Sequence, residues 1–326
     1  MAKKKSGSKK YDKERAAARN RAHVKEKWQF LELLDQLCRS LKQPLPTDKK
    51  DRLPLLEMLF CLVFKGYSQI SDRNLSSFLV EMRTLNYITI DPHFNSFGNY
   101  MNLPAVTLLL DTMLEKIVLA SAEEGVHAAI DSSRLLTPGY HKEKVKKGRY
   151  KRERNNVRLH TIINIKTHLI VAAVVSKHYQ DEKQFFEPLL RRALQRGNII
   201  SIAGDKNYLS KANVKIASEL GCTPYLTPKK NNRSEPEQKG SLWNENIDRY
   251  REGSEEDAER FGQRKQIETT FSMIKLRFGK ELGSKTFQAQ INEALCLAIC
   301  HNLRVLIFNR ELHGTDLTFP PEDKRD

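Results

Sequence analysis

Three acidic residues have positions from which a carboxylate could do chemistry beside a buried core. Asp131 follows the apolar segment His-Ala-Ala-Ile, and Asp205 follows Ser-Ile-Ala-Gly, so each aspartate comes where a buried strand is expected to end. Glu268 lies on a later segment with helical periodicity, on the shoulder of its apolar stripe. That stripe consists of Ile267, Phe271, Ile274 and Phe278.

These carboxylates become useful together only if something removes their mutual repulsion in a water-poor cleft. A divalent cation does this, and oxygen ligands suit Mg²⁺ or Mn²⁺. Two such ions, about 3.5–4 Å apart, hold a phosphate and activate an attacking oxygen. Taken singly, each aspartate has a plainer interpretation as a cap or turn residue, and Glu268 as the helical ion-pair partner of Arg264. The three acids together favour phosphoryl transfer.

Positive charge is concentrated in two parts of the 326-residue chain. The chain has 56 Lys and Arg against 40 Asp and Glu, a net charge of +16. Residues 1–27 and 142–158 together supply nearly all of this excess. Such concentration favours a polyanionic partner, with a solvated basic surface as the alternative. The most apolar segment, 294–308, is too short to cross a membrane, so we expect DNA and no membrane.

The five cysteines are odd in number and form no Cys-x-x-Cys pair, and the N-terminus is charged. These features favour a reducing cytoplasm without a secretory signal. Cys296 and Cys300 lie next to His301 on an apolar helical segment, where core packing is a plainer interpretation than a metal site.

The chain is expected to contain four parts: a basic, disordered arm over 1–27, a helical DNA-binding region over 28–124, an α/β catalytic domain over 125–310 and a tail over 311–326. In the second part, short helices and tight turns suit a helix-turn-helix, with a plain helical bundle as the alternative. In the third, three strands precede alternating helices and strands, which predicts a mixed sheet. We also expect a polar loop over 229–255 and one long helix over 255–278.

The segments around the acids resemble the DDE transposases of prokaryotic insertion sequences. Arg264, Glu268 and Lys275 have the spacing of that family's Tyr-Arg-Glu-Lys signature. The segments AAIDSS (128–133) and GDKNYLSKAN (204–213) resemble its first and second aspartate motifs, and residues 158–175 resemble the hairpin between them. This sequence departs from the pattern at Phe261, where the signature has Tyr, and at Asn207, where Gly is usual.

The resemblance covers about residues 70–310. It implies an RNase H-like mixed-sheet core with an all-helical N-terminal DNA-binding region, in which Asp131, Asp205 and Glu268 are catalytic and bind two Mg²⁺ (or Mn²⁺) ions. It implies a cytoplasmic, nucleoid-associated enzyme that cleaves terminal inverted repeats and joins them to target DNA, as a homodimer in the DNA complex. The expected DNA contacts are Arg264, Lys275, Lys206, Arg158, His160, Lys146, Lys147 and Arg149. The alternatives are a domesticated or inactive DNA-binding homologue and an RNase H-fold nuclease without strand transfer.

Overall fold

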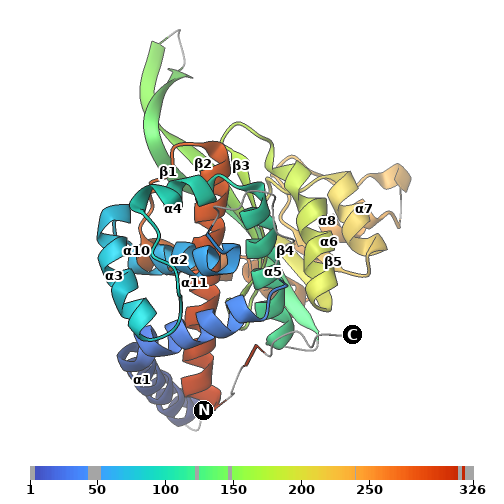
Figure 1. Cartoon of the computed structure of the whole chain (residues 1–326). Coiled ribbons are helices and arrows are strands. Elements are labelled where there is room, and N and C mark those ends of the chain that lie inside the picture. The colour runs from blue at the N-terminus through green and yellow to red at the C-terminus, as the bar shows by residue number, and fades with distance from the viewer. Residues whose placement is uncertain are drawn as a thin grey trace, which may run out of the picture.

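The β-branched segments of the chain pair into one mixed sheet with the order β3-β2-β1-β4-β5 (Figure 1). The strands are β1 (Val126–Val145), β2 (Arg149–Asn164), β3 (Ile170–Lys177), β4 (Ile199–Gly204) and β5 (Thr223–Leu226). The first three form an antiparallel meander, and β4 and β5 run parallel to β1. The computed structural model describes residues 4–42, 53–121, 125–145, 149–238, 240–314 and 318–319.

Helices cover both faces of this sheet. Those before it are α1 (Lys4–Arg39), α2 (Leu55–Ser68), α3 (Asp72–Thr84), α4 (Phe94–Met101) and α5 (Pro104–Ala120). Those within or after it are η2 (Glu182–Phe185), α6 (Phe186–Arg196), α7 (Lys211–Glu219), η3 (Pro236–Gln238), α8 (Leu242–Glu252), α9 (Glu255–Gly262), α10 (Lys265–Phe278) and α11 (Phe287–His313). The mixed sheet and the helical N-terminal region confirm the expected fold class.

Alternate residues of β1 enter two different hydrophobic clusters, as the pleat of a strand requires. Ala129 and Leu135 join the larger cluster with α2, α10 and α11. Ala128 and Ile130 join the smaller cluster with α6, α7 and α8 on the other face. Helix α11 is long and apolar enough to cross a membrane by length and composition alone, but 78% of its most apolar stretch is buried, as in a core helix.

Helix α1 corrects the expectation of a disordered arm over residues 1–27, because residues 4–27 belong to one helix. Ala18 and Ala22 are buried, and the segment is rich in helix-forming Ala, Lys, Arg and Glu. Glu26 accepts hydrogen bonds from Arg304 of α11 (2.9 Å) and Tyr67 of α2 (3.2 Å). Tertiary contacts of this kind hold a helix whose own sequence is too polar to show a clear apolar stripe.

Two other expectations of secondary structure are corrected. The polar loop expected over 229–255 contains α8, which buries Ile247 and begins at the Ser241 cap. The single helix expected over 255–278 is two helices, α9 and α10, separated at Gln263 and Arg264 just after Gly262. Glycine weakens a helix, which gives a local reason for the break. The expected apolar stripe of α10 is confirmed, because all four of its residues are buried.

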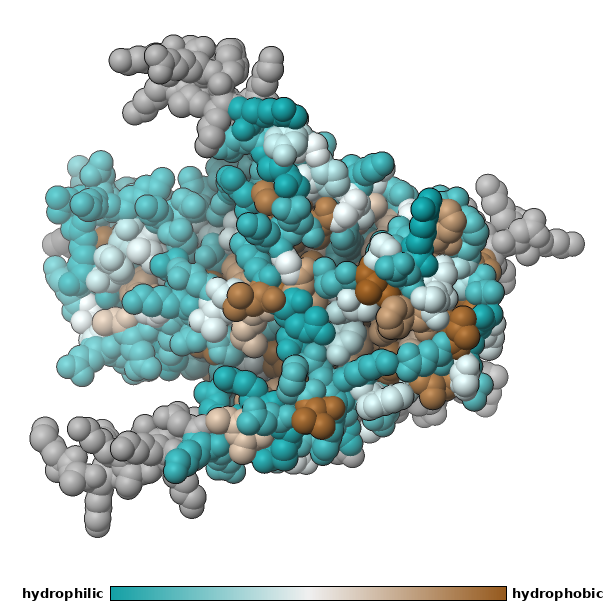
Figure 2. All heavy atoms as spheres, turned by 90° about the vertical axis from the view of Figure 1, so that its left-hand side faces the viewer, coloured by the Kyte–Doolittle hydropathy of each residue, from teal (hydrophilic) through white to brown (hydrophobic). Residues whose placement is uncertain are grey.

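The outer surface of the helical side is polar. Figure 2 shows hydrophilic residues over most of the face that lies on the left of Figure 1, with hydrophobic residues in small patches.

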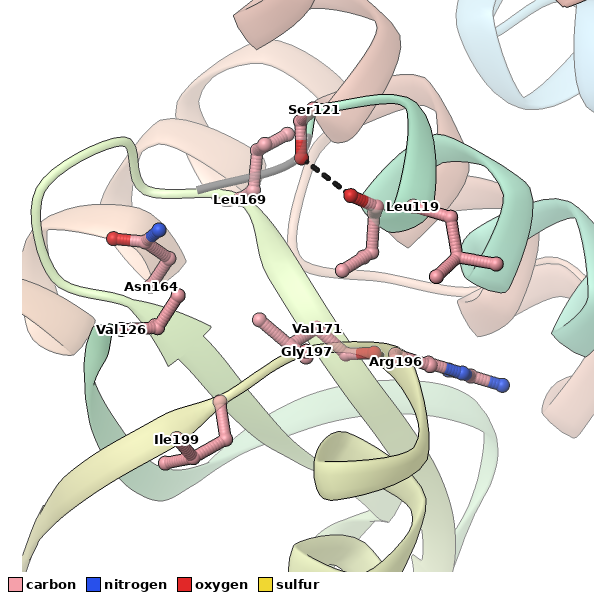
Figure 3. A pocket seen from close by; sticks show the side chains of 10 residues that line it. Leu119, Ser121, Val126, Asn164, Leu169, Val171, Arg196, Gly197 and Ile199 are labelled. Carbon is pink, nitrogen blue, oxygen red and sulfur yellow. Dashed lines mark hydrogen bonds between the residues drawn. The ribbon is translucent and has the colours of Figure 1, made fainter. Parts of the chain in front are cut away.

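A pocket of about 170 Å³ is lined by residues such as Val126, Leu169, Val171 and Ile199 (Figure 3). These residues lie where β1, β3 and β4 begin. The pocket is therefore at the opposite end of the β1–β4 ladder from Asp131 and Asp205.

The Glu26 contacts yield a prediction about stability. Its carboxylate is only 12% exposed and also lies 3.6 Å from Arg277, so Glu26→Ala leaves several polar groups without a partner. We expect the free energy of unfolding to fall by about 1–3 kcal/mol in denaturant titrations. The control is Glu187→Ala, which removes an exposed helical pair with Arg191 and is expected to cost less than about 0.5 kcal/mol. Equal losses in the two variants would contradict the docking of α1 through Glu26.

Candidate active site

The first two acids of the predicted site end neighbouring parallel segments. In the β1–β4 ladder, Ile130 pairs with Gly204, and the next residues are Asp131 and Asp205. Adjacent strands lie about 4.8 Å apart, so the two carboxylates leave the same edge of the sheet side by side. The expectation that β1 ends at Asp131 is wrong, because β1 continues to Val145 beyond its last pairing with β4.

Glu268 comes from the first turn of α10, which packs against β1. Its carboxylate forms an ion pair with Arg264, with 3.1 Å between Arg264 Nη1 and Glu268 Oε1, and its side chain is 57% exposed. Arg264 immediately precedes α10, so the break between α9 and α10 sets this pair at the start of the helix. An acid in the first turn is also favoured by the helix dipole.

The electrostatics of Asp131 report on the whole group. The pKa of this carboxyl is raised to about 6, chiefly by burial and also by the charges of Asp205 and Glu268. The backbone N–H of Ser132, which donates to Asp131 Oδ1 at 2.7 Å, and the charge of Arg264 act in the opposite direction. The structure therefore places Asp205, Glu268 and Arg264 within electrostatic reach of Asp131.

The donor set fits a hydrated divalent cation. Within the described part of the chain, no three His, Cys, Asp or Glu side chains meet closely enough to hold one ion. A two-ion arrangement does not need such a trio, because Mg²⁺ commonly takes one or two carboxylates and completes its shell with water and substrate oxygens. The buried hydroxyl of Thr161, opposite Asp131 in the β1–β2 register, has no hydrogen-bond partner. A water on a cation would satisfy such an oxygen.

His160 differs from its predicted role as a DNA contact. The ring is fully buried, and both of its nitrogens are hydrogen-bonded, Nδ1 to the Tyr208 hydroxyl at 2.9 Å and Nε2 to the Ser176 hydroxyl at 2.8 Å. Burial lowers its pKa to about 4. DNA cannot reach this side chain because α6, α7 and η2 cover that face of the sheet around it. His160 supports the site from beneath.

The direction of these hydrogen bonds can be assigned. Ser176 donates its hydroxyl to the Lys177 carbonyl at 3.2 Å, so a neutral His160 must donate to Ser176 through Nε2. Its Nδ1 then accepts from Tyr208, and the Tyr208 oxygen accepts from Ser132. The chain of donors thus runs from Ser132, beside Asp131, to Lys177, and fixes Tyr208 three residues after Asp205. Sequence reasoning missed this support, although Tyr208 stands in the second aspartate motif.

The remaining predicted DNA contacts have different surroundings. Lys206 is exposed, whereas Arg158 is ion-paired with the buried Glu182. Lys275 lies near Arg134 of β1, and burial together with that positive charge lowers its pKa. Lys146 and Lys147 lie outside the described residues, and Arg149 belongs to β2 with its side chain outside the description.

Phe261, which stands in place of the signature Tyr, is a buried packing residue. Its ring contacts Tyr225 of β5 and Tyr250 of α8 edge to face, with centroids 5.2 and 5.0 Å apart. These contacts fix the end of α9 against the sheet just before Arg264. The aromatic ring at this position therefore has a structural use that does not need the missing hydroxyl.

Comparison with known families agrees with this geometry. Residues 123–303 match the family of the transposase DDE domain, which covers more than half of the chain, and the protein belongs to this family. The match includes all five strands, Asp131, Asp205 and Glu268. Proteins of this family are catalytic and use divalent metals. No curated protein matches the chain significantly.

The raised pKa of Asp131 predicts a pH-dependent loss of stability in protein kept free of metal with EDTA. The folded value of about 6 exceeds the ordinary 3.8, so the folded state binds this proton more tightly than the unfolded chain does. Wild-type stability should therefore fall as pH rises from about 4 to 6. Asp131→Asn removes this dependence and should be more stable at pH 7, by at most about 3 kcal/mol.

Denaturant titrations at pH 4, 5, 6 and 7 measure this difference. The control is Asp91→Asn, which makes the same change in net charge at an exposed position. If the free energy of unfolding of Asp131→Asn follows that of wild type at every pH, the ionised Asp131 carboxylate does not destabilise the folded protein.

The hydrogen-bonded chain beneath the site gives a further prediction. Tyr208→Phe leaves His160 Nδ1 without its donor and should cost about 1–2 kcal/mol of stability. It should also slow metal-dependent DNA cleavage about tenfold, a loss comparable with that of support residues at metal sites. Tyr100→Phe is the control, because it also removes a buried hydroxyl contact, to the Leu53 carbonyl at 2.6 Å, but in the helical region. Similar cleavage by both variants would contradict a role for the chain in positioning the site.

Proposed function

We propose that this protein is an active transposase that cleaves the ends of a DNA element and joins them to target DNA by two-metal phosphoryl transfer. The observation that carries the proposal is the register of the β1–β4 ladder, which sets Asp131 beside Asp205, with Glu268 near enough for its charge to raise the pKa of Asp131. Charged acids near enough to raise the pKa of Asp131 destabilise the folded state when they are all ionised. The placement of Asp131 and Asp205 at the end of the β1–β4 ladder, with Glu268 on the neighbouring α10, fits a site built for cations.

In the proposed mechanism, Asp131, Asp205 and Glu268 hold two Mg²⁺ (or Mn²⁺) ions. When bound, these ions supply Lewis-acid activation of the attacking oxygen and neutralise charge on the phosphate. Arg264 holds Glu268 in place through their ion pair. The donor chain from Ser132 to Lys177 keeps Ser132 of β1 and Tyr208, which follows β4, in place. These positions stay fixed both during hydrolysis of the DNA strand and during the later attack by a 3′-hydroxyl.

Lys275 and Arg134 are proposed to bind the phosphate backbone of DNA near these acids. Lys275 lies on α10 two helical turns beyond Glu268, about 10.5 Å along the axis. The positive charge of Arg134 lowers the pKa of Lys275, and Arg134 also lies 4.0 Å from the Glu153 carboxylate. Two cations near one another favour binding of a phosphate. Lys206, Arg264, Arg149, Lys146 and Lys147 are proposed as further DNA contacts.

The proposal extends to the substrate ends, the assembly, the location and the DNA-binding region. We propose that the substrate ends are terminal inverted repeats and that a homodimer holds two of them, in the cytoplasm on the nucleoid. All five cysteines are buried and free, which fits a reducing compartment. The short turn between α2 and α3, where Gln69 adopts φ 56° and Ser71 caps α3, fits the proposed helix-turn-helix.

A cleavage assay tests the assignment of the three acids. Asp131→Asn, Asp205→Asn and Glu268→Gln should each lower Mg²⁺-dependent cleavage of end DNA more than about 100-fold, because each loses a charged metal ligand. Binding of the same DNA in EDTA should persist. Glu252→Gln, an exposed change on α8, is the control. A variant that cleaves at the wild-type rate would remove that residue from the site, and cleavage without joining of a 3′-end would favour a nuclease.

Lys275→Ala tests the proposed phosphate contact of Lys275. We expect affinity for end DNA to fall several-fold and its dependence on salt to weaken, because one phosphate contact is lost. The thermal midpoint should stay near wild type, since the change removes a positive charge near that of Arg134. Lys215→Ala is the control, because it removes an equal charge from an exposed side chain of α7. Unchanged DNA affinity and cleavage in Lys275→Ala would show that the signature spacing has no function at this position.

A further inference from the structure

Strands β1 and β2 extend far beyond the sheet that they belong to. The last β1 residue paired with β4 is Ile130, and the first β2 residue paired with β3 is Val157. Residues 137–145 of β1 and 149–156 of β2 are here called the arm. In the described ranges, its residues 140–145 pair with 149–154, and neither run pairs with a third strand. The arm projects from the body of the protein in Figure 1. At about 3.3 Å per residue, nine residues reach roughly 30 Å.

The arm has little to gain from folding by itself. A two-stranded ribbon in water is marginally stable because it buries no core. The two ranges of the arm contain six Lys and Arg and two Glu, and few apolar residues. A long, basic, two-stranded ribbon has the width and charge to enter the major groove of DNA, which is about 12 Å wide.

The arm is held in one direction by a bulge where it leaves the sheet. The register shifts between Leu136 and Tyr140, so that residues 137–139 oppose a single residue, Asn155. The Asn155 amide donates to the Pro138 carbonyl at 3.2 Å, and its carbonyl oxygen bonds His141 at 3.1 Å. Gly139 lies at φ +93°, and a Cβ there would come within 2.8 Å of the Asn155 amide. Bulges of this kind turn a strand into a new direction.

The base of the arm is fastened to the segment that follows the catalytic helix. Leu136 donates its N–H to the Lys280 carbonyl and accepts from the Leu282 N–H, both at 2.8 Å. Arg154 of the arm pairs with Glu281 at 3.0 Å. This segment comes directly after α10, which carries Glu268 and Lys275. The direction of the arm is therefore fixed relative to the acids.

One face of the arm presents an aromatic ring among cations. Tyr140 is 53% exposed, and the guanidinium groups of Arg152 and Arg154 lie 4.2 and 5.7 Å from the centre of its ring. Arg154 is held by Glu281, whereas Arg152 is exposed. Arginine that is ordered against a ring pays less entropy when it binds a phosphate. This arrangement fits a nucleic-acid backbone better than an apolar protein surface.

We propose that the arm binds duplex DNA beside the active site, and that the Asn155-locked bulge sets the direction in which it meets the DNA. This inference rests on the proposed function for its choice of DNA as the partner. It predicts two separable properties. Arg152 contributes charge to the contact, and Asn155 contributes geometry without charge.

Fluorescence anisotropy with a labelled 30-base-pair duplex of mixed sequence, in EDTA and over a range of KCl concentrations, tests both properties. Arg152→Ala should weaken binding about fivefold and lower the slope of log affinity against log salt by roughly one. Asn155→Ala should weaken binding severalfold while the net charge stays unchanged. Arg191→Ala, which removes an exposed charge from α6, should bind like wild type.

Thermal unfolding of the same variants should stay near wild type, because both residues lie outside the two hydrophobic clusters. Arg152→Ala that binds like Arg191→Ala would overturn the arm as a DNA contact, and Asn155→Ala with wild-type affinity would overturn the role of the bulge. Arm variants that change self-association in light scattering but not DNA affinity would identify a second copy of the chain as the partner instead.

The absence of metal separates this test from that of the proposed function. A wild-type protein that cleaves DNA, with arm variants that bind normally, overturns only the arm. A protein whose DNA affinity depends on Arg152 and Asn155 but that never cleaves DNA supports the arm and overturns the proposed function.

Discussion

The parallel pairing of β4 with β1 is the constraint on which the rest of the structure depends. Gly204 suits this pairing, since a Cβ there would lie 2.7 Å from a Leu226 methyl group and 2.9 Å from an Ile130 methyl group, and these would have to shift. With Gly204 seated opposite Ile130, the next residue of each chain segment is an aspartate at the same sheet edge. The carboxylates are thus placed by backbone hydrogen bonds, which hold their position more firmly than side-chain contacts would.

The other elements serve this edge from three sides. Helix α10 brings Glu268 to one face of the sheet, and its buried stripe packs into the same cluster as α1, α2 and α11. Tyr208 and His160 support the edge from the other face. Along the strands, β1 does not stop at Asp131 but continues into the arm, so one strand joins the acids to the proposed DNA contact.

The local pattern singled out the aspartates because each follows an apolar segment that would not bury a carboxylate, although β1 continues past Asp131, whose carboxyl is partly buried. It could not predict what covers each face. His160 lies on a strand face like its neighbours, and only the packing of η2, α6 and α7 shows that this face is closed. The residues of α1 are so polar that their burial against α11 has no local signal beyond Ala18 and Ala22. By contrast, the break before α10 and helix α8 had local signals that the expectations passed over: Gly262 for the break, and Leu242, Trp243 and Ile247 for α8.

The central claim is that the sheet edge at Asp131 and Asp205 holds cations against the scissile phosphate of DNA. Replacing one non-bridging oxygen of that phosphate with sulfur tests it directly, because Mg²⁺ binds sulfur poorly and Mn²⁺ accepts softer ligands. The account predicts that one phosphorothioate diastereomer is cleaved much more slowly than the normal DNA in Mg²⁺ and recovers in Mn²⁺. Cleavage that is insensitive to sulfur in both diastereomers, or that proceeds equally in EDTA, would contradict it.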